Sequence, residues 1–134
     1  TAAGPGLALV GVTVLTSHDQ ESFGQAIGRE APSLDAEVAR LAELAMKGGL
    51  AGIVCSPHEA RRMRATLGPA AAIVVPGIRR PGDTPGDQRR TATPAEAVAA
   101  GASHLVVGRP VTAADDPAGV LDELLHAAQT GSLA

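Results

Sequence analysis

The chain has 134 residues, of which 45% are hydrophobic and 19% charged, and its net charge is −3. This length fits one domain with a buried core. The acidic balance and the single aromatic residue, Phe23, argue against a nucleic-acid binder, because base stacking needs aromatic side chains. The lone cysteine, Cys55, excludes an internal disulfide and favours a reducing compartment, so we expect a cytoplasmic protein. No apolar run approaches the ~20 residues of a membrane span.

Four short apolar runs predict strands, at residues 7–17, 51–56, 71–75 and 104–108. Each run is nearly continuously apolar and does not alternate with polar residues. That pattern is typical of strands buried on both faces of a parallel sheet.

Helical patterns follow these runs, with their own start and stop signals. Residues 33–47 have apolar side chains at helical spacing, with Ser33 as N-cap and Gly48–Gly49 as the stop. The segments SPHEA (56–60) and TPAEA (93–97) each combine a capping hydroxyl, a Pro at the first helical position and a Glu that completes a capping box. They predict the starts of two more helices.

A last helix is predicted after Asp116, so that the pair Asp115–Asp116 is interpreted as helix capping and not as a carboxylate pair. We expect this helix to bury four apolar side chains: Val120, Leu121, Leu124 and Leu125.

Strands that alternate with helices predict right-handed crossovers and a parallel α/β sheet. Four such units are half of a TIM-type (β/α)8 barrel, whereas four strands alone leave two apolar edges open. The first residues, TAAGPG, carry neither a starting Met nor the features of a signal peptide. We therefore expect residues 1–134 to form a single domain that is the C-terminal half of a barrel, strands five to eight, although a small open α/β layer is an alternative.

The loop PGIRRPGDTPGDQRRTATP, residues 76–94, concentrates four arginines in an acidic chain. In barrels of this type, phosphate often binds in the loops after strands seven and eight, which here would be this loop and GRPVTAADDP. Arg109 follows Gly108 directly after a strand, where a guanidinium and backbone N–H groups suit a phosphate dianion. The remaining loop arginines, Arg80, Arg89 and Arg90, are expected to be solvated surface side chains.

Three segments together resemble the second half of the orotidine 5′-phosphate decarboxylase family. They are VTVLTS, GLAGIVCSPHEA and VVPGIRRPGDTPGDQRRTATPAEAVAAGASHLVVGRPV, and the resemblance extends from about residue 5 to 128. It implies a homodimeric barrel enzyme that removes CO2 from orotidine monophosphate to give uridine monophosphate, without metal or cofactor.

The resemblance also implies roles for individual residues. Thr16 and Ser17 would meet the pyrimidine ring, and Arg79 would lie in a mobile loop that closes over the substrate. Gln88 would bridge the phosphate and the base. Gly108 and Arg109 would hold the phosphate through an N–H group and the guanidinium.

The family's Lys–Asp catalytic array is absent from this chain. Its motif is Asp-x-Lys-x-x-Asp, and the only lysine, Lys47, stands at a helix end without an Asp at that spacing. We therefore expect this chain to carry the phosphate- and base-binding half, to require the N-terminal half of the barrel, and to be inactive alone.

Other candidate residues have simpler interpretations. Cys55 is expected to be a small buried hydrophobe and not a nucleophile. The four histidines lack metal-ligand spacing, although His18 could lie near a ligand. Two alternative functions stay open: a sister sugar-phosphate enzyme of the same superfamily, and a non-catalytic phosphate-binding half-barrel.

Overall fold

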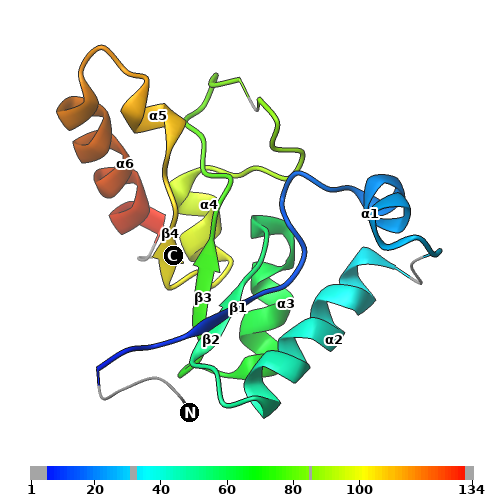
Figure 1. Cartoon of the computed structure of the whole chain (residues 1–134). Helices are drawn as coiled ribbons and strands as arrows, with labels where there is room; N and C mark the ends of the chain where they lie inside the picture. The colour runs from blue at the N-terminus through cyan, green and yellow to red at the C-terminus, as the bar shows by residue number, and fades with distance from the viewer. Residues whose placement is uncertain (1–5, 31–32, 85, 132–134) are drawn as a thin grey trace.

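A computed structural model describes residues 6–30, 33–84 and 86–131 (Figure 1). Within this part, short strands alternate with helices along most of the sequence. The strands are β1 (Val10–Val12), β2 (Gly52–Val54), β3 (Ala72–Val75) and β4 (His104–Leu105). The helices are α1 (Gln20–Ile27), α2 (Leu34–Lys47), α3 (Pro57–Leu67), α4 (Pro94–Ala99), α5 (Arg109–Thr112) and α6 (Pro117–Gly131).

The four strands form one parallel sheet in the order β1-β2-β3-β4. The register aligns Gly11 with Ile53, Ile53 with Ile73, and Val75 with Leu105. Because all strands run the same way, the loops that leave their carboxyl ends emerge at one edge of the sheet. The predicted parallel α/β arrangement, with strands in chain order, is confirmed.

Each strand is shorter than its apolar run predicted, and the first differs most. The run 7–17 contributes only Val10–Val12, and Leu7 and Leu9 are exposed outside it. β1 lies at an edge of the sheet and is paired with β2 alone, so its ladder extends only as far as β2 does. Apolar composition could not show where that pairing stops.

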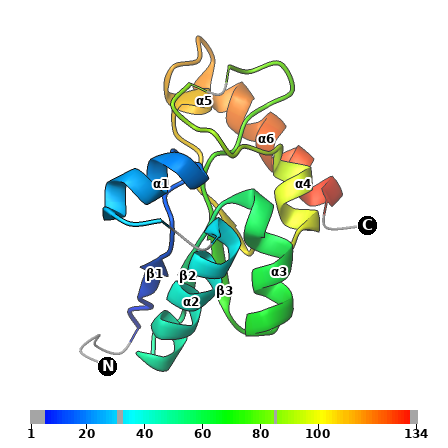
Figure 2. The same cartoon turned by 90° about the vertical axis from the view of Figure 1, so that its right-hand side faces the viewer.

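α2, α3, α4 and α6 follow one another along the helical layer, whereas α1 and α5 lie near the loops at the end of the sheet (Figures 1 and 2). α2 packs on β1 and β2, and α3 packs on β3. The core between these layers includes Ile53, Ile73 and Met63, which are fully buried. Elsewhere Val12 and Val106 are 58% and 49% exposed, because no helix of the described part covers their side of the sheet. The prediction of strands buried on both faces is therefore wrong for these residues.

The predicted capping residues begin the helices to which they were assigned. Ser33 accepts a hydrogen bond from the Ala36 N–H at 3.0 Å, and the capping boxes of α3 and α4 are both closed. The Gly119 N–H donates to the Asp116 carboxylate at 3.0 Å, which confirms Asp116 as a cap for α6. These signals are local in the sequence, which is why they located helix starts correctly.

Two helices, α1 and α5, were not predicted. α1 begins after Asp19, whose carboxylate accepts from the Ser22 N–H at 2.9 Å. This hydrogen bond is the main cause that lowers the pKa of Asp19 to about 2. Ser22 closes the capping box in place of the usual Glu or Gln, so the signal was present in an uncommon form. α5 is a four-residue helix in the segment that was expected to be a loop.

α6 buries fewer side chains than its sequence predicted. Leu124 is buried and Val120 packs against the core, but Leu121 and Leu125 are 44% and 53% exposed. The helix contacts α4 and α5, so only the stripe that faces them is covered. The prediction is therefore wrong for Leu121 and Leu125.

The close approach of β2 and β3 at Gly52 gives a test of the sheet. A Cβ at residue 52 would lie against the backbone carbonyl oxygen of Ala72 and 2.7 Å from its Cα. We expect Gly52→Ala to lower the free energy of unfolding by about 1–3 kcal/mol, because the added methyl group overpacks the contact between the strands. Urea denaturation measures this change. An unchanged transition midpoint would contradict this strand spacing.

Candidate functional site

A cavity of about 320 Å³ lies where the loops after β1, β3 and β4 meet. Its lining includes Thr16 after β1, Arg79 and Gln88 after β3, and Gly108 and Arg109 after β4. These residues are far apart in the sequence, and the shared edge of a parallel sheet brings them together. They are all of the predicted binding residues except Ser17.

The floor of this cavity is apolar. Val12, Val54 and Val106 line it from the side of the sheet that no described helix covers. Polar and cationic side chains stand around this floor. Such a combination of an apolar surface and a few convergent polar groups is typical of small-molecule sites, and it suits a flat ring with an anionic group at one end.

Thr16 and Gln88 are in direct contact at this site. The Thr16 hydroxyl, on a residue only 5% exposed, donates to the side-chain oxygen of Gln88. The Arg89 backbone N–H donates to the Thr16 carbonyl at 3.1 Å. The end of the β3 loop is therefore held against the end of β1, and this brings Gln88 next to a candidate base-contacting residue.

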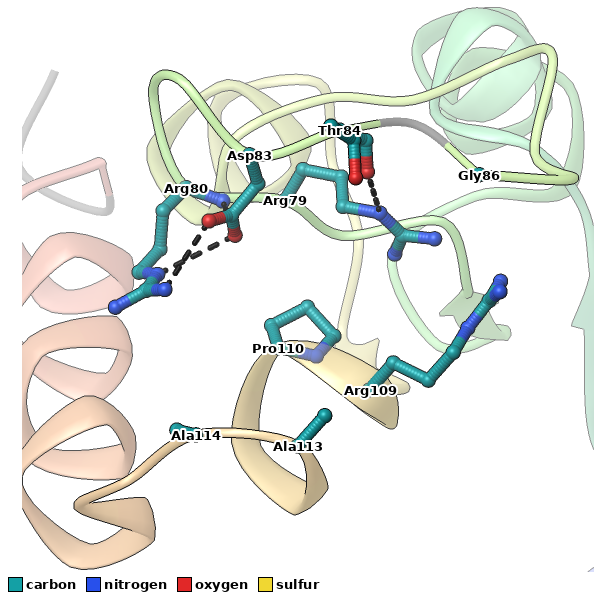
Figure 3. Close-up of a pocket in the computed structure, with 9 residues that line it drawn as sticks. All are labelled: Arg79, Arg80, Asp83, Thr84, Gly86, Arg109, Pro110, Ala113 and Ala114. Carbon is teal, nitrogen blue, oxygen red and sulfur yellow. Dashed lines mark hydrogen bonds and ion pairs between the residues drawn. The ribbon is translucent and has the colours of Figure 1, made fainter.

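Arg79 and Arg109 approach one another across a second cavity of about 300 Å³, adjacent to the first (Figure 3). Arg79 donates to the carbonyls of Thr84 at 3.3 Å and Ile78 at 2.7 Å. Arg109 forms an ion pair with Asp87. Arg80 turns to the other side and pairs with Asp83 at 3.1 Å. The two guanidinium groups that share both cavities could grip one anion between them.

The arginines lower the pKa values of two carboxyl groups in the loop. The hydrogen bond from Arg109 lowers the pKa of Asp87, and the hydrogen bond from Arg80 lowers the pKa of Asp83. Both groups are therefore ionised at neutral pH. An incoming anion must compete with the Asp87 carboxylate for Arg109.

Ser17 and His18 are beside the main cavity but do not line it. Ser17 is half-buried and follows Thr16 directly. The His18 ring lies 3.3 Å from the Ser22 hydroxyl and edge-on to Phe23, so its contacts in this structure are with α1.

Arg90 overturns one expectation, since it is buried and not a solvated surface side chain. It is only 6% exposed and forms an ion pair with Glu59. Arg80 and Arg89 also have carboxylate partners, in Asp83 and Asp19. The sequence carried no signal for the burial of Arg90, because its partners come from distant segments.

Cys55 is buried as predicted, although it borders the cavity. Desolvation, followed by the nearby charge of Glu59, raises the pKa of its thiol to about 12. A thiol with such a pKa is not a nucleophile at neutral pH.

The described residues contain no group of three or more His, Cys, Asp or Glu side chains arranged to hold a metal ion. None of the helices in the described ranges is long and apolar enough to cross a membrane.

Several known proteins are similar to this chain over most of its length. Residues 1–124 match the family described as Orotidine 5'-phosphate decarboxylase / HUMPS family. The orotidine 5'-phosphate decarboxylase of Anaeromyxobacter sp. (strain K) is 54% identical over 116 residues, which cover 87% of this chain and 50% of that protein. The enzyme of the same name from Paramagnetospirillum magneticum is 57% identical over 111 residues, covering 83% of this chain and 46% of that protein.

Solved structures agree with this relationship. The orotidine 5'-phosphate decarboxylase of Lactobacillus acidophilus matches with a TM-score of 0.75 and 31% identity, over 96% of this chain and 52% of that one. The Metallosphaera sedula enzyme matches with a TM-score of 0.58 and 26% identity, over 72% of this chain and 44% of that one.

The chain spans about half the length of the curated relatives that it matches. The matched structures are TIM-type barrels, so the prediction of a half-barrel α/β fold is confirmed. Together, the family match over residues 1–124 and the identities above 50% show that this chain belongs to the orotidine 5'-phosphate decarboxylase family.

Proposed function

We propose that residues 1–134 form the phosphate- and base-binding half of an orotidine 5′-phosphate decarboxylase. The complete barrel would convert orotidine monophosphate to uridine monophosphate and CO2, without metal or cofactor. The observation that carries this proposal is the convergence of Thr16, Gln88, Gly108 and Arg109 on one cavity from three separate loops. A family relationship alone would not require these residues to meet.

Each residue has a task that suits its position. Arg109 and the Gly108 N–H bind the phosphate, and a Cβ at Gly108 would meet nothing within 4 Å, so its backbone is accessible. Arg79 contributes a second guanidinium from the loop that closes over the ligand. Gln88 bridges the phosphate and the ring, while Thr16 and Ser17 contact the pyrimidine. These groups are neutral hydrogen-bonding groups or cations, which suits a nucleotide monophosphate.

Binding of the phosphate can contribute to the reaction although the reacting carbon lies on the distant ring. Loss of CO2 leaves an electron pair on the pyrimidine ring, which then takes up a proton. Binding energy from the phosphate can hold the loop closed and exclude water, and this strengthens every electrostatic interaction at the ring. This half of the barrel therefore supplies remote binding energy, and not the proton.

The proton donor would come from the N-terminal half of the barrel. Lys47, the only lysine in the chain, lies at the end of α2 and 3.6 Å from Glu43 on the same helix. It is exposed and does not line the cavity. We therefore propose that this chain is inactive alone. The family resemblance is the basis for the further proposal that the complete enzyme is a homodimer, and the single cysteine is the basis for placing it in the cytoplasm.

Activity should depend on both halves of the barrel. We define the joined barrel as this chain fused behind the N-terminal half of the Anaeromyxobacter relative, which is 54% identical over the shared half. The joined barrel is expected to convert orotidine monophosphate to uridine monophosphate, whereas each half alone gives no conversion. The loss of substrate absorbance measures the reaction. A folded but inactive joined barrel, beside an active intact relative, would contradict the proposed function.

Arg109→Ala tests the phosphate grip. Loss of a charge-assisted hydrogen bond worth about 1.5–3 kcal/mol should weaken uridine monophosphate binding to the joined barrel roughly tenfold to a hundredfold. Uridine, which lacks the phosphate, should bind with nearly unchanged affinity in the same calorimetric titration.

Arg62→Ala is the matched control, because it removes the same charge from a residue outside the site, paired with Asp35 on the helix side. It should leave both affinities within about twofold, as expected for a surface substitution. Equal losses for uridine and uridine monophosphate in Arg109→Ala would show that Arg109 supports the shape of the site and does not bind the phosphate.

A further inference from the structure

Among the arginines of the loop after β3, Arg90 is the one that is buried, and it does not line the cavity. We propose that Arg90 is a positioning residue: it fixes the end of the β3 loop to the ends of β1 and β2, and thereby holds Gln88 against Thr16. This inference rests on the proposed function, since it assigns a support to one of the proposed binding residues.

The guanidinium of Arg90 contacts two segments that are far apart in the sequence. One nitrogen, Nη1, donates to the Ser56 hydroxyl at 3.1 Å and to the Glu59 carboxylate at the start of α3. The other, Nη2, donates to the carbonyls of Val14 at 3.3 Å and Leu15 at 3.0 Å, just after β1. Two adjacent chain ends at the carboxyl edge of the sheet are thus held by one side chain.

Burial makes this arrangement specific. The side chains of Arg90 and Glu59 are 8% and 3% exposed, so water stabilises neither charge. Removal of either side chain would leave the other as an uncompensated buried charge. Both terminal nitrogens of Arg90 make hydrogen bonds, and Arg can make them in two directions at once because its donors form a rigid fork. The buried Nε has no hydrogen-bond partner among the described residues. A lysine could pair with Glu59 but would lose the second arm to β1.

Neighbouring backbone contacts carry the effect from Arg90 to the cavity. The Arg89 N–H donates to the Thr16 carbonyl at 3.1 Å, and the base of the loop is closed by the Arg79 N–H to the Ala92 carbonyl at 3.0 Å. At Gly77, a Cβ would come within 2.9 Å of the Arg90 carbonyl oxygen, so the two stems of the loop are closely packed. Gln88 lies directly before this fixed segment, and its side chain accepts from the Thr16 hydroxyl.

The loop therefore has two parts with different tasks. The stem at residues 88–92 is anchored by Arg90. The described residues of the tip, 80–84 and 86–87, are held by a half-buried ion pair between Arg80 and Asp83, by the pair of Arg80 with Glu123, and by the exposed pair of Asp87 with Arg109. Gln88 sits at the boundary between them.

A double-mutant cycle in the joined barrel tests whether Arg90 acts through Gln88. Arg90→Lys should weaken uridine monophosphate binding about tenfold when Gln88 is present, and by less than about twofold in the Gln88→Ala background, since coupled residues give non-additive effects. Arg89→Lys is the matched control, because Arg89 is exposed and pairs only with Asp19 in the described structure; it should change affinity by less than about twofold in both backgrounds.

Equal losses from Arg90→Lys in the two backgrounds, or no loss in either, would overturn the inference, because a purely structural role gives additive effects. Failure of the unsubstituted joined barrel to bind uridine monophosphate would instead refute the proposed function. The two failures are therefore distinguishable.

Hydrogen exchange on the unsubstituted chain provides a second measurement that needs neither ligand nor a stable variant. The Arg89 N–H, bonded to Thr16 beside the anchor, should exchange at least about tenfold more slowly than the backbone N–H groups of Gly82 and Gly86 at the tip. Exchange of Arg89 as fast as that of the tip would overturn the anchor.

Discussion

The parallel direction of all four strands is the constraint on which the site depends. It sends every loop that follows a strand to the same edge, so Thr16, Gln88 and Arg109 meet although 93 positions separate the first from the last. The helices then cover one face of the sheet and leave valines of the other face as the floor of the cavity. An antiparallel sheet of the same strands would divide these loops between two ends. The binding chemistry is thus a consequence of topology first and of side-chain choice second.

The loop after β3 contains both an exposed and a buried ion pair. At the tip, the Asp87 carboxylate pairs with Arg109 from the loop after β4, and both side chains are exposed, so this ion pair is weak and a phosphate can replace the carboxylate. In the stem, Arg90 and Glu59 are buried, where breaking the pair leaves an uncompensated charge. The same residue type therefore gives an exchangeable contact in one part of the loop and a fixed one in the other. This division suits the proposed lid, whose tip would move while its base stays in register with the sheet.

Local signals in the sequence predicted what depends on neighbours in the chain. The capping residues Ser33, Ser56 and Thr93 located helix starts, and the order of apolar runs predicted the parallel sheet. Properties that depend on distant partners were not predictable in this way. Arg90 is buried by contacts with residues 31 and 76 positions away, and the ends of β1 are set by its single neighbour β2. The proposed binding residues were named from the resemblance to a family, which supplied the long-range information that composition and spacing lack.

The proposed function requires that the loops after β3 and β4 build one phosphate site beside the end of β1. A crystal structure of the joined barrel with uridine monophosphate tests it most directly. Our account predicts phosphate oxygens within hydrogen-bond distance of the Arg109 guanidinium and the Gly108 N–H, with Gln88 between the phosphate and the ring and Thr16 beside the ring. A phosphate bound without contact to residues 108 and 109, or a ring bound away from the end of β1, would contradict it.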